Sequence, residues 1–131
     1  MANTFTKVIM VDGARNAVLN CNGYADTSDF SSTDVAVPAD YTPTPTTFRV
    51  DRIQYQVEAG ITVRLWWDAT TPVLFATLSG SGGNDFRRVG GLQNTAGATG
   101  YTGKITFTTE GWASSAIDNF TFTLEMVKIG V

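Results

Sequence analysis

Histidine is absent from this chain of 131 residues, and Cys21 is its one cysteine. The absence of His removes the commonest general base, the usual Ser–His and Cys–His pairs of nucleophilic catalysis, and most zinc sites. A single Cys cannot close an internal disulfide, so the sequence does not predict an oxidising compartment. Because no pairing of a nucleophile with a base is visible, we expect a protein that is not an enzyme and carries no cofactor.

Charge is also scarce. Charged residues make up 16% of the chain and hydrophobic residues 43%, a balance that predicts a folded rather than a disordered protein. The net charge of −3 argues against binding to nucleic acid or to an anionic membrane through bulk charge. No stretch approaches the roughly 20 apolar residues of a membrane-spanning helix. Residues 1–12 lack the apolar core of a secretory signal, so we expect synthesis in a cytoplasm.

What the chain does contain favours β-strands. Strong helix formers are few, with Glu and Lys at only three positions each, whereas Thr is abundant and aromatic residues make up 11%. Short β-rich segments separated by turn residues predict an all-β fold, an antiparallel, jelly-roll-like β-sandwich of about eight strands in one domain over residues 1–131. The expected strands are residues 4–11, 14–24, 34–37, 48–58, 61–68, 73–78, 103–109 and 118–129, with a further short one near 86–89.

Two turns are specific enough to predict. Asp12-Gly13 is typical of a type I′ hairpin turn between the first two strands. The strands at 48–58 and 61–68 alternate apolar and polar residues, and a three-residue loop, 59–61, would pair them as a hairpin with one apolar face. The predicted core face of this hairpin consists of Ile53, Tyr55, Val57, Val63, Leu65 and Trp67.

Two long segments are expected to be irregular. Residues 25–47 carry three of the four prolines and alternate Pro with Thr, which favours an extended conformation. Residues 79–103 are rich in Gly and are predicted to be a loop region. Loops of this length are usually functional or partly disordered, and the sequence leaves that alternative open.

Several patterns that could indicate a binding or catalytic site lack the neighbouring residues that such a site requires. The glycines at 80–83 lack the Lys-Ser/Thr and the following helix of a phosphate-binding loop. Asp26, Asp29 and Asp34 do not have the spacing of a calcium loop. Glu58 and Glu125 are expected to be solvated rather than paired for glycoside hydrolysis. Arg87-Arg88 is expected to lie in a solvated loop.

The residues that we expect to contact a partner lie on the other face of the predicted hairpin. Alternation places Trp66 outward beside Arg64 and Gln54, and Trp and Arg are enriched at protein–protein interfaces. The alternative for Trp66 is burial under a second sheet or a loop. Residues 1–6 are a further candidate, as an extending arm. The full set of interface candidates is Gln54, Gln56, Arg64, Trp66, Tyr41, Pro43 and Pro45.

Several segments resemble small virion structural proteins of tailed bacteriophages. The resemblance covers most of the chain and is firmest from about residue 48 onward. It rests on short stretches typical of strands and turns, spread along the chain, rather than on a catalytic signature. The segments are Asp12–Val18, Leu65–Thr71 ("LWWDATT"), Phe75–Gly80, Gly90–Asn94, Gly100–Thr109 ("GYTGKITFTT"), Gly111-Trp112 and Phe122–Lys128.

This resemblance implies a capsid decoration, or cement, protein without enzymatic activity. Such a protein is made in the bacterial host cytoplasm, binds the major capsid protein on the outer surface of the head, and often forms a homotrimer or another homo-oligomer. It implies no nucleic-acid or membrane partner. Two other functions remain open: a carbohydrate- or receptor-binding module of a tail fibre or spike, and a minor head–tail or tail subunit.

Overall fold

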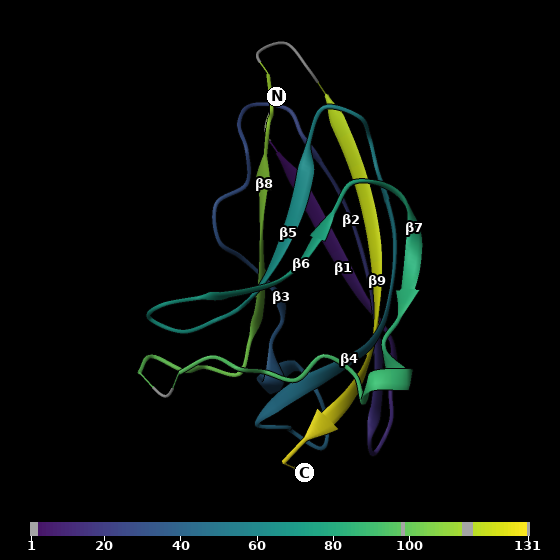
Figure 1. Cartoon of the computed structure of the whole chain (residues 1–131), viewed down its shortest axis with the longest axis vertical. Coiled ribbons are helices and arrows are strands. Elements are labelled where there is room, and N and C mark those ends of the chain that lie inside the picture. The colour runs from purple at the N-terminus through teal and green to yellow at the C-terminus, as the bar shows by residue number, and fades with distance from the viewer. Residues whose placement is uncertain (1–2, 98, 114–116, 131) are drawn as a thin grey trace.

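The computed structural model describes residues 3–97, 99–113 and 117–130. Within them the chain forms two antiparallel sheets, one of five strands in the order β1-β2-β9-β4-β7 and one of four in the order β3-β8-β5-β6 (Figure 1). The elements are β1 (Thr4–Asp12), β2 (Asn16–Ala25), β3 (Thr33–Ala36), η1 (Pro38–Asp40), β4 (Thr47–Val57), β5 (Thr62–Trp67), β6 (Val73–Leu78), β7 (Gly80–Asp85), η2 (Arg87–Val89), β8 (Ile105–Glu110) and β9 (Asp118–Ile129).

The strand pairing is that of a jelly roll, as the sequence predicts. Strands β2, β3, β4 and β5 pair antiparallel with β9, β8, β7 and β6, respectively. This nested order describes one long antiparallel hairpin that has been rolled up, so that its pairs alternate between two packed sheets. Strand β1 adds to the free edge of β2 and forms the outer strand of the five-stranded sheet.

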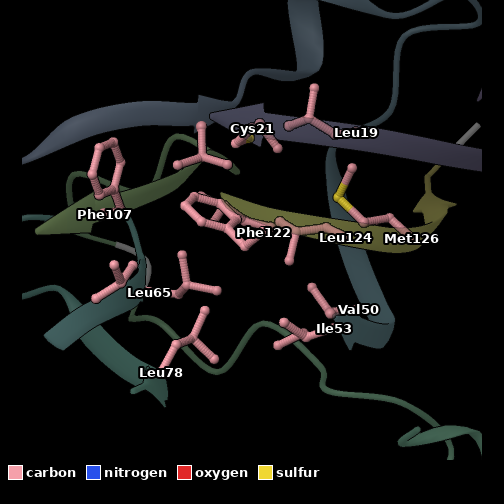
Figure 2. Packing of buried hydrophobic residues seen from close by; sticks show 14 of the residues in the cluster. Leu19, Cys21, Val50, Ile53, Leu65, Leu78, Phe107, Phe122, Leu124 and Met126 are labelled. Atoms are coloured by element: carbon pink, nitrogen blue, oxygen red, sulfur yellow. The ribbon is translucent and has the colours of Figure 1, made fainter. Parts of the chain in front are cut away.

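The core lies between the two sheets. Phe122 and Leu124 of β9 face Leu65 and Leu78 of the opposite sheet (Figure 2), and all four are at most 2% exposed. The predicted inward residues of β4 and β5 are confirmed, with Tyr55 only partly buried. Burial of the alternating apolar side chains of both sheets is the main stabilising contribution that the sequence pattern encodes.

The predicted hairpin between residues 48–58 and 61–68 is wrong. Strand β4 lies in the five-stranded sheet and β5 in the four-stranded sheet, so the connection at residues 58–61 crosses from one layer to the other. Alternation shows only which side of a strand faces the core. Two strands paired in one sheet and two strands that face each other across a sandwich produce the same alternation.

The first turn also differs from the prediction. The backbone N–H of Gly13 donates to the Asn16 carbonyl (2.9 Å), so the two loop residues are Ala14 and Arg15 rather than Asp12 and Gly13. Because Ala17, Leu19 and Cys21 are all buried, the inward face of β2 sets the register with β1 and shifts the turn along the chain.

The two segments predicted to be irregular contain regular structure. Residues 80–85 form β7, an exposed edge strand paired with β4, rather than a loop, and residues 87–89 form the 3₁₀ helix η2 rather than a strand. Glycine carries no side chain that could reveal alternation, so this strand has no apolar pattern in the sequence. Residues 25–47 include β3, which confirms the short strand predicted at 34–37, and the 3₁₀ helix η1, which was not predicted. The chain bends at 41–43, within the stretch predicted to run extended.

Candidate functional site

The predicted interface residues do not form one surface. Gln54 and Gln56 point outward from the five-stranded sheet and are exposed, whereas Arg64 and Trp66 lie on the outer face of the four-stranded sheet. The two pairs are therefore on opposite sides of the sandwich, because the strands that carry them face each other across the core rather than pairing side by side.

Trp66 is partly exposed on its own face. Its indole Nε1–H donates to the Thr108 hydroxyl (3.0 Å), and Arg64 pairs with Glu110 (2.9 Å). The register places Leu74 opposite Trp66, and Leu74 is 43% exposed. The Trp66–Leu74 pair is a small apolar spot on the four-stranded sheet, so complete burial of Trp66 by a second sheet or loop is wrong.

Tyr41 and Pro45 are buried, so they do not belong to an exposed surface. The helix η1 turns the chain inward, and the Tyr41 ring packs edge-on against Phe48 with the ring centroids 5.0 Å apart. Pro43 is exposed. Of the proposed N-terminal arm, residues 4–6 belong to β1, and Met1 and Ala2 lie outside the described residues.

An ion pair between a buried Lys and a partly exposed Asp holds this region together, and no pattern in the sequence predicted it. The Lys128 side chain is fully buried at the end of β9, and its Nζ lies 2.5 Å from Asp12 Oδ1. Asp12 also accepts from the Thr42 backbone N–H (3.1 Å), and Nζ lies 5.8 Å from the centre of the Tyr41 ring. The hydrogen bond from Lys128 lowers the pKa of Asp12. Asp12 thus joins β1, β9 and the segment 25–47.

The most unusual surface feature is the apolar edge, which we define as Val8, Ile9, Met10 and Val11 of β1. All four side chains are exposed, by 53%, 38%, 62% and 46%, respectively. Val8 and Val11 lie opposite Asn20 and Val18 on the outer face of the sheet, and the register shifts between Ile9 and Val11. Side chains alternate between the two faces of a strand, so a run of four apolar residues cannot all be buried on one face. The exposed apolar edge could therefore have been predicted from the sequence.

Beyond the apolar edge, the outer face of the five-stranded sheet is polar and mostly uncharged. The strand registers place Thr6, Asn22, Thr121 and Gln56 side by side in one row across four strands. The next row consists of Thr4, Tyr24 and Asn119, and at its end the Glu58 N–H donates to the Asn119 carbonyl. An open groove of about 580 Å³ lies over these two rows. We call it the polar groove.

Two amide side chains in the polar groove are held by hydrogen bonds. Asn119 donates from its backbone N–H (2.7 Å) and from its side-chain Nδ2 (3.1 Å) to Glu58 Oε2. Asn22 donates from Nδ2 to Asn20 Oδ1 (2.6 Å), and Asn20 donates in turn to the Thr123 hydroxyl. Each groove amide therefore donates one hydrogen bond from its Nδ2 within the protein, which orients its carbonyl oxygen.

The aspartates considered for a cation site are dispersed. Asp34 pairs with Lys104 (3.3 Å), and Asp29 accepts from the Trp112 backbone N–H (3.0 Å). Among the described residues no three acidic or Cys side chains come together in a way that could hold a metal ion. Arg87 is bound to Asp85, which lowers the pKa of that carboxyl.

Cys21 lies inside the core and is shielded from reagents in solution. Its side chain is fully buried, and burial raises the pKa of its thiol to about 12. Since the thiolate is the reactive form, this Cys is a packing residue rather than a nucleophile.

Comparisons with protein-family models, with curated proteins and with solved structures each find no match to this chain. In the part of the chain that the structure describes, no helix has the length and apolar character needed to cross a membrane. The apolar edge, the Trp66–Leu74 spot and the polar groove are surfaces of the described residues from which a function can be inferred.

Proposed function

We propose that this chain is a non-enzymatic structural protein of a tailed-phage virion, a capsid decoration protein. It binds the major capsid protein on the outer surface of the head and stabilises the expanded shell. The observation that carries the proposal is the apolar edge, four consecutive exposed apolar residues on the outer strand of the five-stranded sheet. The resemblance of the chain to phage virion proteins supplies the identity of the partner.

The apolar edge has the properties of a surface that a partner covers. Val8 and Val11 lie on the outer face of the sheet, and Ile9, opposite Leu19, lies on the other side of the same edge strand. Exposed apolar side chains gathered on one element mark interaction sites, and a partner that excludes water from them gains free energy in proportion to the area buried. A jelly roll is a rigid scaffold found in viral capsid proteins and in lectins, so the fold is compatible with this role without specifying it.

A second adhesive surface on the opposite sheet supports an assembly role. The Trp66–Leu74 spot lies on the outer face of the four-stranded sheet, across the core from the five-stranded sheet that carries the apolar edge. A decoration protein that forms a homotrimer or another homo-oligomer needs one surface for its own copies and one for the shell. Symmetry then repeats each contact, so a modest affinity per contact is sufficient for stable binding.

Met10→Asp is expected to abolish binding to capsids while leaving the fold intact. Met10 is 62% exposed, so a charge there stays hydrated in the free protein but must be desolvated in an apolar contact. The measurement mixes the purified protein with capsids assembled without it, sediments the capsids and images them by cryo-electron microscopy. Wild-type protein should add density to the outer shell, and the variant should remain in the supernatant with an unchanged Tm.

The matched control is Val89→Asp, which changes an isolated apolar residue that is 76% exposed on η2. It should bind capsids as the wild type does. Capsids decorated by Met10→Asp to wild-type occupancy would contradict the assignment of the apolar edge. A few copies per virion at the tail vertex, instead of hundreds over the head, would favour a head–tail or tail subunit.

Trp66→Ala is expected to weaken self-association while the monomer still folds. The monomer should lose about 1 kcal/mol from the hydrogen bond to Thr108, and a further amount from the buried part of the indole. Analytical ultracentrifugation measures the oligomer, and thermal unfolding measures the monomer. Arg88→Ala, at an exposed position of η2, is the control. A variant that fails to fold would show that Trp66 acts as a core residue, and an unchanged oligomer would remove it from the interface.

A further inference from the structure

We infer that the polar groove binds a neutral oligosaccharide. This activity goes beyond shell binding, because the groove lies over the first residues of β1 while the apolar edge lies further along that strand. The groove is open, has a volume of about 580 Å³ and runs across four strands of the five-stranded sheet. That volume is within the range of small-molecule binding sites.

The hydrogen-bonding groups of the groove match those of a sugar. Asn22 and Asn119 each donate one hydrogen bond within the protein from Nδ2, which fixes the amide plane. The carbonyl oxygen and the second N–H of each amide are left for sugar hydroxyls. The exposed Gln56 amide can both donate and accept. The Asn22 and Asn119 amides are held in place before the ligand arrives, which reduces the entropy that binding loses.

An aromatic side chain lies among these polar groups. Tyr24 is the outward-pointing aromatic residue of the groove, between Thr4 and Asn119 in one row of the sheet. It is only partly buried. An aromatic ring beside amide and hydroxyl groups suits a ligand with apolar C–H faces and polar edges, and the pyranose ring of a sugar has this character.

The charges of the groove favour a neutral ligand over an anionic one. Neither Lys nor Arg is among the described residues that line it, so nothing there would neutralise a phosphate or an acidic sugar. Its one charged side chain, Glu58, accepts two hydrogen bonds from Asn119 and so holds that amide in place. A neutral oligosaccharide therefore fits this groove better than a nucleotide or a sialylated glycan does.

The test first applies the fluorescently labelled protein to an array of plant, animal and bacterial glycans. Bound neutral glycans are then titrated into ¹⁵N-labelled protein, together with maltohexaose, cellohexaose and chitohexaose. We expect saturable shifts at the backbone amides of Asn22, Tyr24 and Asn119. Tyr24→Ala should weaken binding by about tenfold, the value of one aromatic contact, and Tyr24→Phe should restore most of it.

The matched control is Tyr101→Ala, which removes another partly exposed tyrosine outside the groove. Gln56→Ala is a second test variant, because its exposed side chain can be removed without disturbing the core. Binding restricted to acidic glycans, the absence of any saturable shift, or equal affinity in Tyr24→Ala would overturn the inference. Met10→Asp should bind glycans normally, so failure of sugar binding and failure of capsid binding are distinguishable.

Discussion

Val63→Asp is expected to prevent folding. Val63 is completely buried at the interface of the two sheets, opposite Leu78 on one neighbouring strand and Thr109 on the other. An Asp in that position would place a carboxylate without a partner in an apolar environment, or would be protonated at a cost of several kcal/mol. The whole stability of a domain of this size is about 5–15 kcal/mol, so this single change removes most of it.

The measurement is far-UV circular dichroism and NMR on the purified protein at 25 °C. The wild type should show a cooperative thermal transition by circular dichroism and dispersed amide signals by NMR. The variant should show neither. Val89→Asp makes the same substitution at a position that is 76% exposed and should change Tm by only a few degrees. A soluble, monodisperse Val63→Asp protein with native-like signals would contradict the inward orientation of β5.

The inward faces of the strands could be predicted from the sequence because they depend on local alternation. In β9, the apolar side chains at 120, 122, 124 and 126 share one face, and all four are buried. The bounds of β9 also match the prediction, since its pattern begins after the turn residues near Asp118. A short-period signal of this kind follows directly from the geometry of a pleated strand.

The partner of each strand could not be predicted in the same way. Strands β4 and β5 carry complementary apolar faces, which led to a predicted hairpin, yet they face each other across the core. The exposed strand β7 pairs with β4 although glycine fills half of its six positions, and its pairing depends on backbone hydrogen bonds that leave no apolar pattern. Pairing in a jelly roll is set by contacts between residues far apart in the chain.

The candidate surfaces were predicted only in part. Gln56 lies in the polar groove, and Trp66 points outward as alternation required. The groove itself brings Thr4, Tyr24 and Asn119 together from three strands, and no local pattern connects residues so distant in sequence. The apolar edge differs, because a run of four exposed apolar residues is visible in the sequence once the strand is recognised.

The second large effect is expected at the ion pair between Asp12 and Lys128. Asp12→Ala should lower Tm by about 10 °C or more, because it leaves the fully buried Lys128 ammonium without its acceptor. Lys128→Met should be much milder. A Met fills the same space without a charge, and the Asp12 carboxylate, whose side chain is 31% exposed, stays hydrated and still accepts from the Thr42 N–H.

The pH dependence of Tm provides an independent check on this pair. The pKa of Asp12 is lower in the folded protein than its ordinary value of 3.8. The unfolded state therefore binds more protons than the folded state in that range, so the stabilisation is fully present above pH 4 or so and is lost as the pH falls through the folded pKa. The Tm of the wild type should therefore fall further between about pH 5 and pH 2 than the Tm of Lys128→Met does.

Differential scanning calorimetry of the wild type and the three variants, Asp12→Ala, Lys128→Met and the double variant, tests both expectations. The double variant removes the buried charge together with its acceptor, so its Tm should lie above that of Asp12→Ala. If Asp12→Ala and Lys128→Met were equally destabilising, the cost would come from losing the interaction between the two side chains rather than from an isolated buried charge. A steep acid transition that persists in Lys128→Met would place the responsible carboxylate elsewhere in the chain.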